Sequence, residues 1–325
     1  MCSHNKFMPI ACPHKVEQGA PFCIAEEPVD VPCGAFLYQR IEQPDQIPPP
    51  NENIIDIAIL DMNHGWPNLG HDSIVHLIKD AACDILTILQ STGLSLRALS
   101  YDIRRTAIIP EKSGGRFRLY LGTGGPGHID PHQNDGKYEG SQGIVENIAW
   151  EAPLFRLFDS IYADENSALL AVCHTFGVMC RWSGIARAVL RGPEEGGKSS
   201  GVLENILTPE GQQHPWFRHF AEMLPGKNRL RIMDSRLYDL ILNGSLKNGA
   251  TPIGFETVKI GGPQGKSVTM MEWVRDKGGI MPRIFAVNHH PEIIDRKRQL
   301  QILQRKFDHG EVTREWYEER LRLVT

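Results

Sequence analysis

The sequence predicts an α/β fold in which a doubly wound, mostly parallel sheet is flanked by helices. Apolar runs of strand length at 54–60, 117–121 and 168–172 alternate with segments of helical periodicity. Glycine-rich or polar turns follow these runs directly, and a doubly wound sheet places its ligand sites at such strand ends. The 325 residues, of which 41% are hydrophobic, are enough for one large α/β domain or two small ones.

Composition argues against several classes of function. The formal net charge of -4 gives no electrostatic reason to expect a nucleic acid or an anionic membrane as partner. Residues 1–12 lack the apolar core of a signal peptide, and no uninterrupted apolar stretch approaches the roughly 20 residues of a membrane helix. Seven cysteines without tight spacing suit a reducing compartment better than a disulfide framework. We therefore expect a cytoplasmic protein.

Residues 1–52 are predicted to form an irregular N-terminal extension, because they are rich in Pro, Gln and Glu and show little periodicity. Thiolate and imidazole are ligands that zinc prefers, so a structural zinc site is one alternative for the Cys and His residues of this segment: Cys2, His4, Cys12, His14, Cys23 and Cys33. Their spacings match no common zinc finger, which favours an extended arm packed over the main domain. We expect no cofactor.

The folded domain is predicted to start near residue 53 with a buried strand at 54–61. A glycine-rich turn follows at 63–70. Asp72 can cap the next helix, and the apolar residues of that helix fall on one face: Ile74, Leu77, Ile78 and Ala82.

A second strand is expected within 95–103, and a third at 117–121. The third strand leads into Gly122-Thr-Gly-Gly-Pro-Gly-His128, which suits either a backbone that approaches a ligand closely or an ordinary tight turn. Apolar spacing within 144–158 then predicts helix on either side of Pro153.

Cys173 follows the strand run Ala168-Leu-Leu-Ala-Val172 and precedes an apolar helical pattern. A nucleophile at such a turn stands at a helix N-terminus, where backbone N–H groups and the helix dipole lower a thiol pKa and can hold an oxyanion. Cys173 is therefore a candidate nucleophile, with a buried structural cysteine as the alternative. Cys180, on the same helix, is expected in the core.

Residues 192–199 satisfy the phosphate-loop pattern G-x-x-x-x-G-K-[ST]. A phosphate loop must open a helix of useful length, but Gly201 follows soon and Pro209 closes the segment. Glu194 and Glu195 would also place two negative charges beside the phosphates. We interpret the segment as a hairpin loop.

The rest of the chain is predicted to extend the sheet and to end in helices. A short helix with proline in its first turn is expected at 214–220. Helical spacing predicts two final helices, from 295 to 309 and from 313 to 324, so that 296–325 forms a C-terminal helical extension. Strands are predicted at 202–207, 230–233, 253–258, 268–274 and 284–287.

Three strand-end features together supply what thiol-dependent acyl transfer requires: a thiolate, a base, an orienter for the base, and N–H donors for the oxyanion. Cys173, His290 and Glu292 are the candidates for the first three roles. Strand alternation puts His290 and Glu292 on the same side if the strand continues. The backbone N–H groups of Gly125 and His174 are the expected donors.

With these residues the chain resembles the class I glutamine amidotransferase family over roughly residues 54–295. Thr-Gly-Gly-Pro-Gly at 123–127 is similar to the Ser-Gly-Gly-Pro-Gly oxyanion turn of the family. Asn-His-His-Pro-Glu at 288–292 resembles its Gln-Phe-His-Pro-Glu, and Ala-Val-Cys-His-Thr-Phe-Gly at 171–177 resembles its Gly-Ile-Cys-x-Gly-x-Gln.

The resemblance implies that 53–295 is an amidotransferase-like domain of flavodoxin-like architecture with a Cys-His-Glu catalytic triad. It also implies an oxyanion-hole and substrate-binding set, which consists of Gly124, Gly125, Gly127, His174 and Thr175. Two departures concern the substrate pocket. The family's glycine two residues after the nucleophile is Thr175 here, where a side chain crowds the neighbouring strand. The family's substrate-holding glutamine is Gly177, which leaves glutamine specificity open.

Two functions of different classes follow. The first is a glutaminase-type cysteine hydrolase or amidotransferase that cleaves the C–N bond of glutamine or a γ-glutamyl-type amide through a Cys173 thioester. Its partners would be the small amide and, for a glutaminase, an ammonia-accepting synthetase in trans. The alternative is a catalytically inactive scaffold of the same fold that binds a partner or small molecule. The intact Cys-His-Glu set favours the enzyme.

Overall fold

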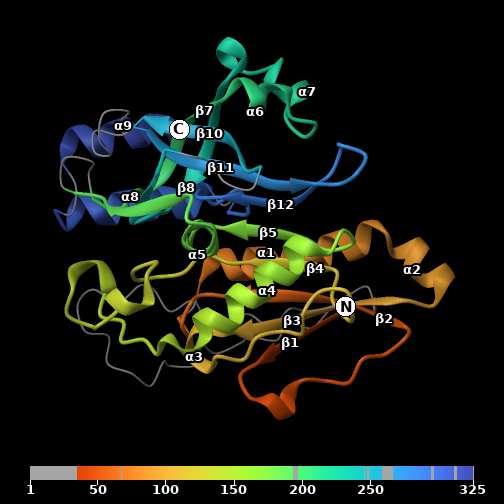
Figure 1. Cartoon of the computed structure of the whole chain (residues 1–325). Helices are drawn as coiled ribbons and strands as arrows, with labels where there is room; N and C mark the ends of the chain where they lie inside the picture. The colour runs from red at the N-terminus through yellow and green to blue at the C-terminus, as the bar shows by residue number, and fades with distance from the viewer. Residues whose placement is uncertain are drawn as a thin grey trace, which may run out of the picture.

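The computed structural model describes residues 35–66, 68–192, 197–244, 246, 249–257, 266–293, 296–310 and 313–324. In these ranges ten strands form one sheet in the order β1-β3-β2-β4-β5-β12-β11-β10-β7-β8 (Figure 1). The strands are β1 Phe36–Ile41, β2 Ile54–Asp61, β3 Ser95–Asp102, β4 Leu119–Gly122, β5 Ala168–Val172, β7 Gly201–Leu207, β8 Arg229–Asp234, β10 Thr251–Thr257, β11 Lys266–Arg275 and β12 Pro282–Val287.

The parallel part of the sheet runs from β1 to β12 in the order above. Its register pairs Leu60 with Gly122, Gly122 with Ala171, and Val172 with Val287. The carboxyl ends of β2, β4, β5 and β12 therefore meet at one edge of the sheet. This arrangement confirms the predicted fold class, and it brings together the segments that follow those four strands.

Helices cover both faces of the parallel strands, as the continuous apolar runs require. Alternate residues of β2 face opposite ways: Ala58 and Leu60 belong to one apolar cluster, Ile57 and Ile59 to another. The first cluster contains side chains of α4 and α5, and the second contains side chains of α1 and α2 (Figure 1). The helices are α1 Leu69–Asp84, α2 Leu86–Thr92, α3 Ile103–Thr106, α4 Glu151–Ala163, α5 His174–Ser183, α6 Pro209–Gln213, α7 Arg218–Ala221, α8 Arg296–Asp308 and α9 Arg314–Val324.

The second part of the sheet is antiparallel, from β12 through β11, β10 and β7 to β8. The strands predicted here are present, and each begins one or two residues before its predicted position. A separate antiparallel pair, β6 (Ala186–Leu190) with β9 (Tyr238–Leu242), was not predicted. Helices α8 and α9 pack together beside β7, in agreement with the predicted helical C-terminus (Figure 1).

The prediction that all of 1–52 is irregular is wrong for one segment, because Phe36–Ile41 forms β1 and pairs in parallel with β3. The segment escapes recognition because the middle of the strand, Tyr38-Gln-Arg40, is polar or half-exposed. Residues 1–34, with the four cysteines considered for zinc, lie outside the described residues. The domain boundaries at 52 and 295 stay a prediction.

Two helix starts differ from the prediction. Helix α1 is capped by Asn68, whose side chain accepts hydrogen bonds from the N–H groups of Gly70 and His71, so Asp72 lies inside the first turn. The helix expected at 214–220 is replaced by α6 and α7. Pro209 rather than Pro215 occupies the first turn of α6, and the His214 side chain accepts a hydrogen bond from Trp216 N–H in the turn between them.

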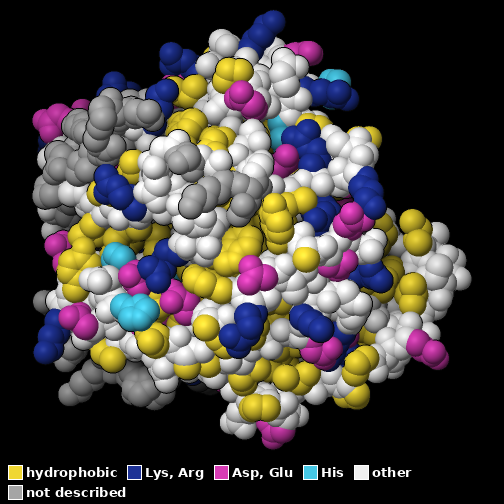
Figure 2. Space-filling view, viewed as in Figure 1, with side chains coloured by type: hydrophobic (Ala, Val, Ile, Leu, Met, Phe, Trp, Pro, Cys, Tyr) yellow, Lys and Arg dark blue, Asp and Glu magenta, His cyan; other side chains and the backbone are white. Residues whose placement is uncertain are grey.

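In the part of the chain that the structure describes, no helix combines the length and apolarity needed to cross a bilayer. On the face shown in Figure 2, basic and acidic side chains are interspersed.

Candidate active site

The segments that follow β2, β4, β5 and β12 converge at the carboxyl edge of the parallel sheet. These are the turn at 62–70, the glycine-rich turn at 123–127, the start of α5, and residues 288–292. In doubly wound folds, ligands bind at the carboxyl ends of the parallel strands. All the residues predicted for the site lie on these four segments.

Cys173 occupies a strained turn between β5 and α5. Its φ of 47° and ψ of −100° are rare for a residue with a side chain, and such strain concentrates at functional sites. The Cys173 N–H donates to Val287 O at 2.7 Å, which ties the turn to the end of β12. The thiol is partly exposed and stands as the N-cap of the ten-residue helix α5. A ligand can therefore reach it where the helix dipole favours negative charge.

His290 and Glu292 form the second part of the site. His290 Nδ1 lies 2.7 Å from Glu292 Oε1, and both residues are buried. Because Nδ1 faces the carboxylate, Nε2 remains for the thiol. The two side chains meet beside Gly124: the position of its absent Cβ is 2.7 Å from His290 Cε1 and 3.5 Å from Cys173 Cβ. The structure thus brings Cys173, His290 and Glu292 together, although more than a hundred residues separate the first two.

The electrostatics of His290 favour its protonated form. Burial lowers the pKa of this imidazole, but the negative charges of Glu292 and Cys173, with hydrogen bonds to both, hold it well above its ordinary value. A thiolate and an imidazolium stabilise one another in such a pair. The arrangement can supply a nucleophile and the proton for a leaving group.

Three glycines allow the segments to approach closely. A Cβ on Gly124 would lie 2.7 Å from His290 Cε1, and one on Gly125 would clash with Met62 O. Gly127 has a φ of 80°, a conformation that side chains disfavour. The N–H groups of Gly125 and His174 have no backbone acceptor among the described residues. They are thus available as the expected pair of donors.

Replacing Gly124 with alanine should lower turnover about 10²-fold, because the new methyl must displace either the His290 ring or the turn. Gly115→Ala is the matched control, since nothing lies within 4 Å of its Cβ position. The measurement is steady-state kinetics on an amide substrate with both variants folded. Equal activities of the two variants would contradict the close approach of Gly124 to His290.

Thr175 and Gly177, the two departures from the family pattern, are each matched by a complementary residue. A Cβ on Gly122 would overlap the Thr175 side chain. Because Gly122 has no Cβ, Thr175 fits against the neighbouring strand without the crowding that its side chain predicted. Thr175 Oγ1 also donates to Thr123 O at 2.7 Å. At Gly177, the place of a Cβ is taken by Ile129. The Ile129 side chain therefore occupies the space that any side chain at position 177 would need.

Two further histidines at the site, His174 and His289, are buried and held neutral. Burial lowers the pKa of His289 to about 3, and the positive charges of Arg236 and His290 act in the same direction. For His174, burial and then the charge of Arg104 lower the pKa well below its ordinary value. Proton binding by either ring therefore opposes folding.

The fold should lose stability on acidification partly through His289. Its folded pKa lies below the unfolded value of about 6.5, so its contribution is present above that pH and is lost as the pH falls towards about 3. His289→Gln should reduce the slope of unfolding free energy against pH by about 1.4 kcal/mol per pH unit in that window. Urea unfolding between pH 7 and pH 4 measures it; parallel slopes would contradict the assignment.

Arg104 and Glu146, which were not predicted from the sequence, form a bidentate ion pair next to the glycine-rich turn. Arg104 Nε and Nη2 lie 2.5 and 2.8 Å from the two carboxylate oxygens, and neither side chain is exposed. Neither residue belongs to a local motif. A basic residue just after a buried strand is the one signal that could have indicated Arg104.

The remaining predictions about the site have mixed outcomes. Cys180 is buried as predicted, and burial raises the pKa of its thiol. Part of the phosphate-loop pattern, residues 193–196, lies outside the described residues. In the ranges that are described, no group of three or more His, Cys, Asp or Glu side chains is arranged to hold a metal ion.

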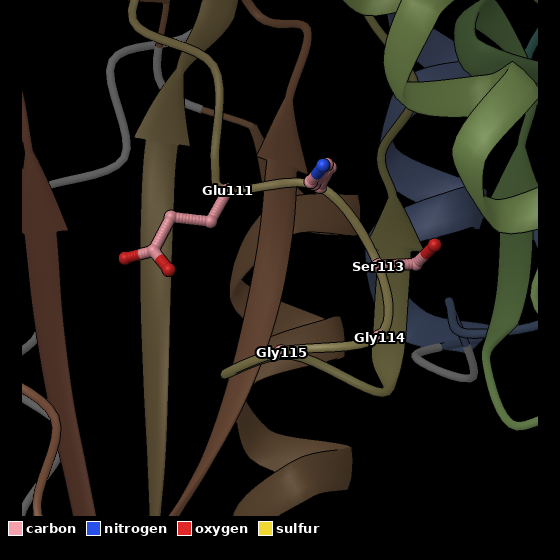
Figure 3. Close-up of a pocket in the computed structure, with 5 residues that line it drawn as sticks. Glu111, Ser113, Gly114 and Gly115 are labelled. Carbon is pink, nitrogen blue, oxygen red and sulfur yellow. The ribbon is translucent and has the colours of Figure 1, made fainter.

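A pocket elsewhere is lined by Glu111, Lys112, Ser113, Gly114 and Gly115 (Figure 3). This loop precedes β4, so it lies at the amino ends of the parallel strands, away from Cys173. The labelled side chains of Glu111 and Ser113 point in different directions in Figure 3. The pocket is separate from the candidate site.

Comparisons with known proteins give distant structural similarities. No family model and no curated protein matches the sequence. The solved structure of SMU.1228c is 16% identical with a TM-score of 0.45, and the match covers 77% of this chain and 82% of that one. A protein from Thermoplasma acidophilum, provisionally described as a GMP synthase subunit, is 15% identical, with a TM-score of 0.39 over 75% of this chain and 87% of its own.

A ThuA-like protein from Bacteroides uniformis is 11% identical, with a TM-score of 0.38 over 77% of this chain and 88% of its own. With TM-scores below 0.5, these similarities do not bear on the function of this chain.

Proposed function

We propose that the protein is a cysteine-dependent amidase of the glutamine amidotransferase type, which cleaves glutamine or a γ-glutamyl-type amide through a Cys173 thioester. The observation that carries the proposal is the convergence of Cys173, His290 and Glu292 at one edge of the sheet. The resemblance of the three sequence motifs to the class I glutamine amidotransferases supports the same chemistry.

The proposed reaction has two halves. In the first, the Cys173 thiolate attacks the amide carbonyl, and the oxyanion accepts hydrogen bonds from the N–H groups of Gly125 and His174. His290 then gives its proton to the departing nitrogen as the C–N bond breaks. In the second half, His290 takes a proton from water, which attacks the thioester and releases the acid and the Cys173 thiolate. Glu292 fixes the orientation of His290 throughout.

The acyl donor is proposed from the residue at position 177. Gly177 offers no side-chain amide, and the buried side chain of Ile129 occupies the space that a side chain there would need. This position therefore favours a donor whose recognition does not need a hydrogen bond there, which leans towards a γ-glutamyl amide other than free glutamine. No nucleic-acid or membrane partner is part of the proposal. A cytoplasmic location and a synthetase in trans remain proposals of the same kind.

The test compares ammonia release from glutamine with amine release from γ-glutamyl-p-nitroanilide, each with and without cell extract. Amine release without extract would support a stand-alone amidase. Ammonia release that requires extract would support a glutaminase with a partner. If neither substrate turns over and a chloroketone glutamine analogue labels Cys173 no faster than Cys83, the scaffold alternative holds.

A further inference from the structure

Arg104 contacts the glycine-rich turn at Pro126. It stands in α3, immediately after β3, and is 1% exposed. Its Nη1 donates to Pro126 O at 2.6 Å and to Met62 O at 2.9 Å. One guanidinium therefore joins two of the segments that build the site, those after β2 and β4.

Gly125 lies between these same groups. The position of its absent Cβ is 3.3 Å from Arg104 Nη1 and against Met62 O. Gly125 therefore packs directly against the Met62 carbonyl and the Arg104 guanidinium, with no room for a side chain between them.

Glu146 holds Arg104 and extends the support to the end of the turn. Its carboxylate accepts hydrogen bonds from Trp150 Nε1 at 3.0 Å and Asn134 Nδ2 at 2.6 Å, besides those of Arg104. Asn134 Oδ1 in turn accepts from His128 N–H at 2.7 Å. Each oxygen of the carboxylate therefore has at least two donors.

Nearby groups complete the support of the turn. Gly127 N–H donates to Gln142 Oε1 at 2.8 Å, and Thr123 O accepts from Thr175. A fully buried ion pair gives little net stability, because desolvation offsets the attraction between its charges. Its hydrogen bonds instead specify one geometry.

We propose that Arg104 is a positioning residue, which through its pairing with Glu146 fixes the turn at 124–127 so that the Gly125 N–H faces the oxyanion. This inference rests on the proposed function for its kinetic consequence. The support of the turn by Arg104 does not depend on whether an amide is the substrate.

The experiment compares Arg104→Lys with Arg97→Lys. Arg97 forms a similar buried bidentate pair, with Asp56 at 2.6 and 3.1 Å, near the amino ends of β2 and β3. Lysine keeps the charge but cannot make both contacts. Arg104→Lys should lower kcat about 10²–10³-fold with KM changed less than about threefold, the effect of losing one oxyanion donor. Arg97→Lys should leave both constants within about threefold of wild type.

Amide hydrogen exchange at Gly127 and His128 tests the structural claim without a substrate, because these N–H groups donate to Gln142 Oε1 and Asn134 Oδ1 at the end of the turn. Exchange should be at least about tenfold faster in Arg104→Lys than in wild type or Arg97→Lys. If wild type turns over no amide, the proposed function fails while this measurement still decides the role of Arg104. Wild-type exchange and kcat in Arg104→Lys, or equal losses in Arg97→Lys, would overturn the inference.

Glu146→Gln provides the second variant if Arg104→Lys does not fold. It preserves the size of the side chain but removes the charge and one of the oxygen acceptors, so Arg104 loses one of its two hydrogen bonds to residue 146. We expect kcat to fall at least about tenfold and exchange at Gly127 and His128 to increase. Unchanged values in a folded Glu146→Gln would equally contradict the assignment.

Discussion

Replacing Cys173 with alanine should lower amide turnover by at least about 10⁴-fold, the largest effect expected from any single substitution in this chain. The reason is that the Cys173 sulfur is the atom that forms the proposed thioester, so the thioester cannot form without it. The substitution removes a single sulfur atom and leaves the backbone turn in place. The measurement is single-turnover release of p-nitroaniline, with circular dichroism as the check on folding.

The other cysteines of the described chain provide controls for the Cys173 variant. Cys83 is exposed on α1 and Cys180 is buried in α5, and neither contacts the proposed reaction path. Cys83→Ala should keep wild-type turnover. Mass spectrometry after treatment with the chloroketone glutamine analogue should find the adduct on Cys173 alone. Retention of more than about 1% of turnover by Cys173→Ala would exclude the thioester route.

The sequence predicts that the residues of the candidate site lie together, because the main ones follow apolar strand runs. In a parallel sheet the carboxyl ends of neighbouring strands meet at one edge, so Cys173 and His290 could be placed together from local patterns and the fold rule. The elbow at Cys173 and the glycines at 124 and 125 are equally local. The strand-to-helix turn at Cys173 and the close approach at the two glycines are each indicated by the residue types at those positions.

What could not be predicted depends on contacts between distant segments. The polar middle of β1 gives no strand pattern, and the strand exists because β3 offers it a parallel partner. Thr175 fits because Gly122 lacks a side chain, a match between two strand ends that neither segment shows alone. The Arg104–Glu146 pair likewise joins residues 42 positions apart. Such complementarity exists only in the folded chain.

Replacing His290 with asparagine should lower turnover about 10³–10⁴-fold, because the chain loses both its base and the proton for the leaving nitrogen. Alkylation of Cys173 by iodoacetamide at neutral pH should also slow by at least about tenfold, since no imidazole remains to take up the thiol proton. Glu292→Gln is the matched variant: it keeps the hydrogen bond to Nδ1 but removes the charge, so its losses should be smaller.

The pH dependence of the unfolding free energy tests whether His290 is protonated in the folded protein. The folded pKa of His290 lies above its unfolded value, so its contribution to unfolding free energy is fully present below about pH 6.5 and is lost as the pH rises through the folded pKa. The stability difference between wild type and His290→Asn should therefore shrink from pH 6.5 to pH 10 in urea titrations. A constant difference would mean that His290 is neutral in the folded protein, and a neutral imidazole beside Cys173 would leave the thiol without its counter-ion.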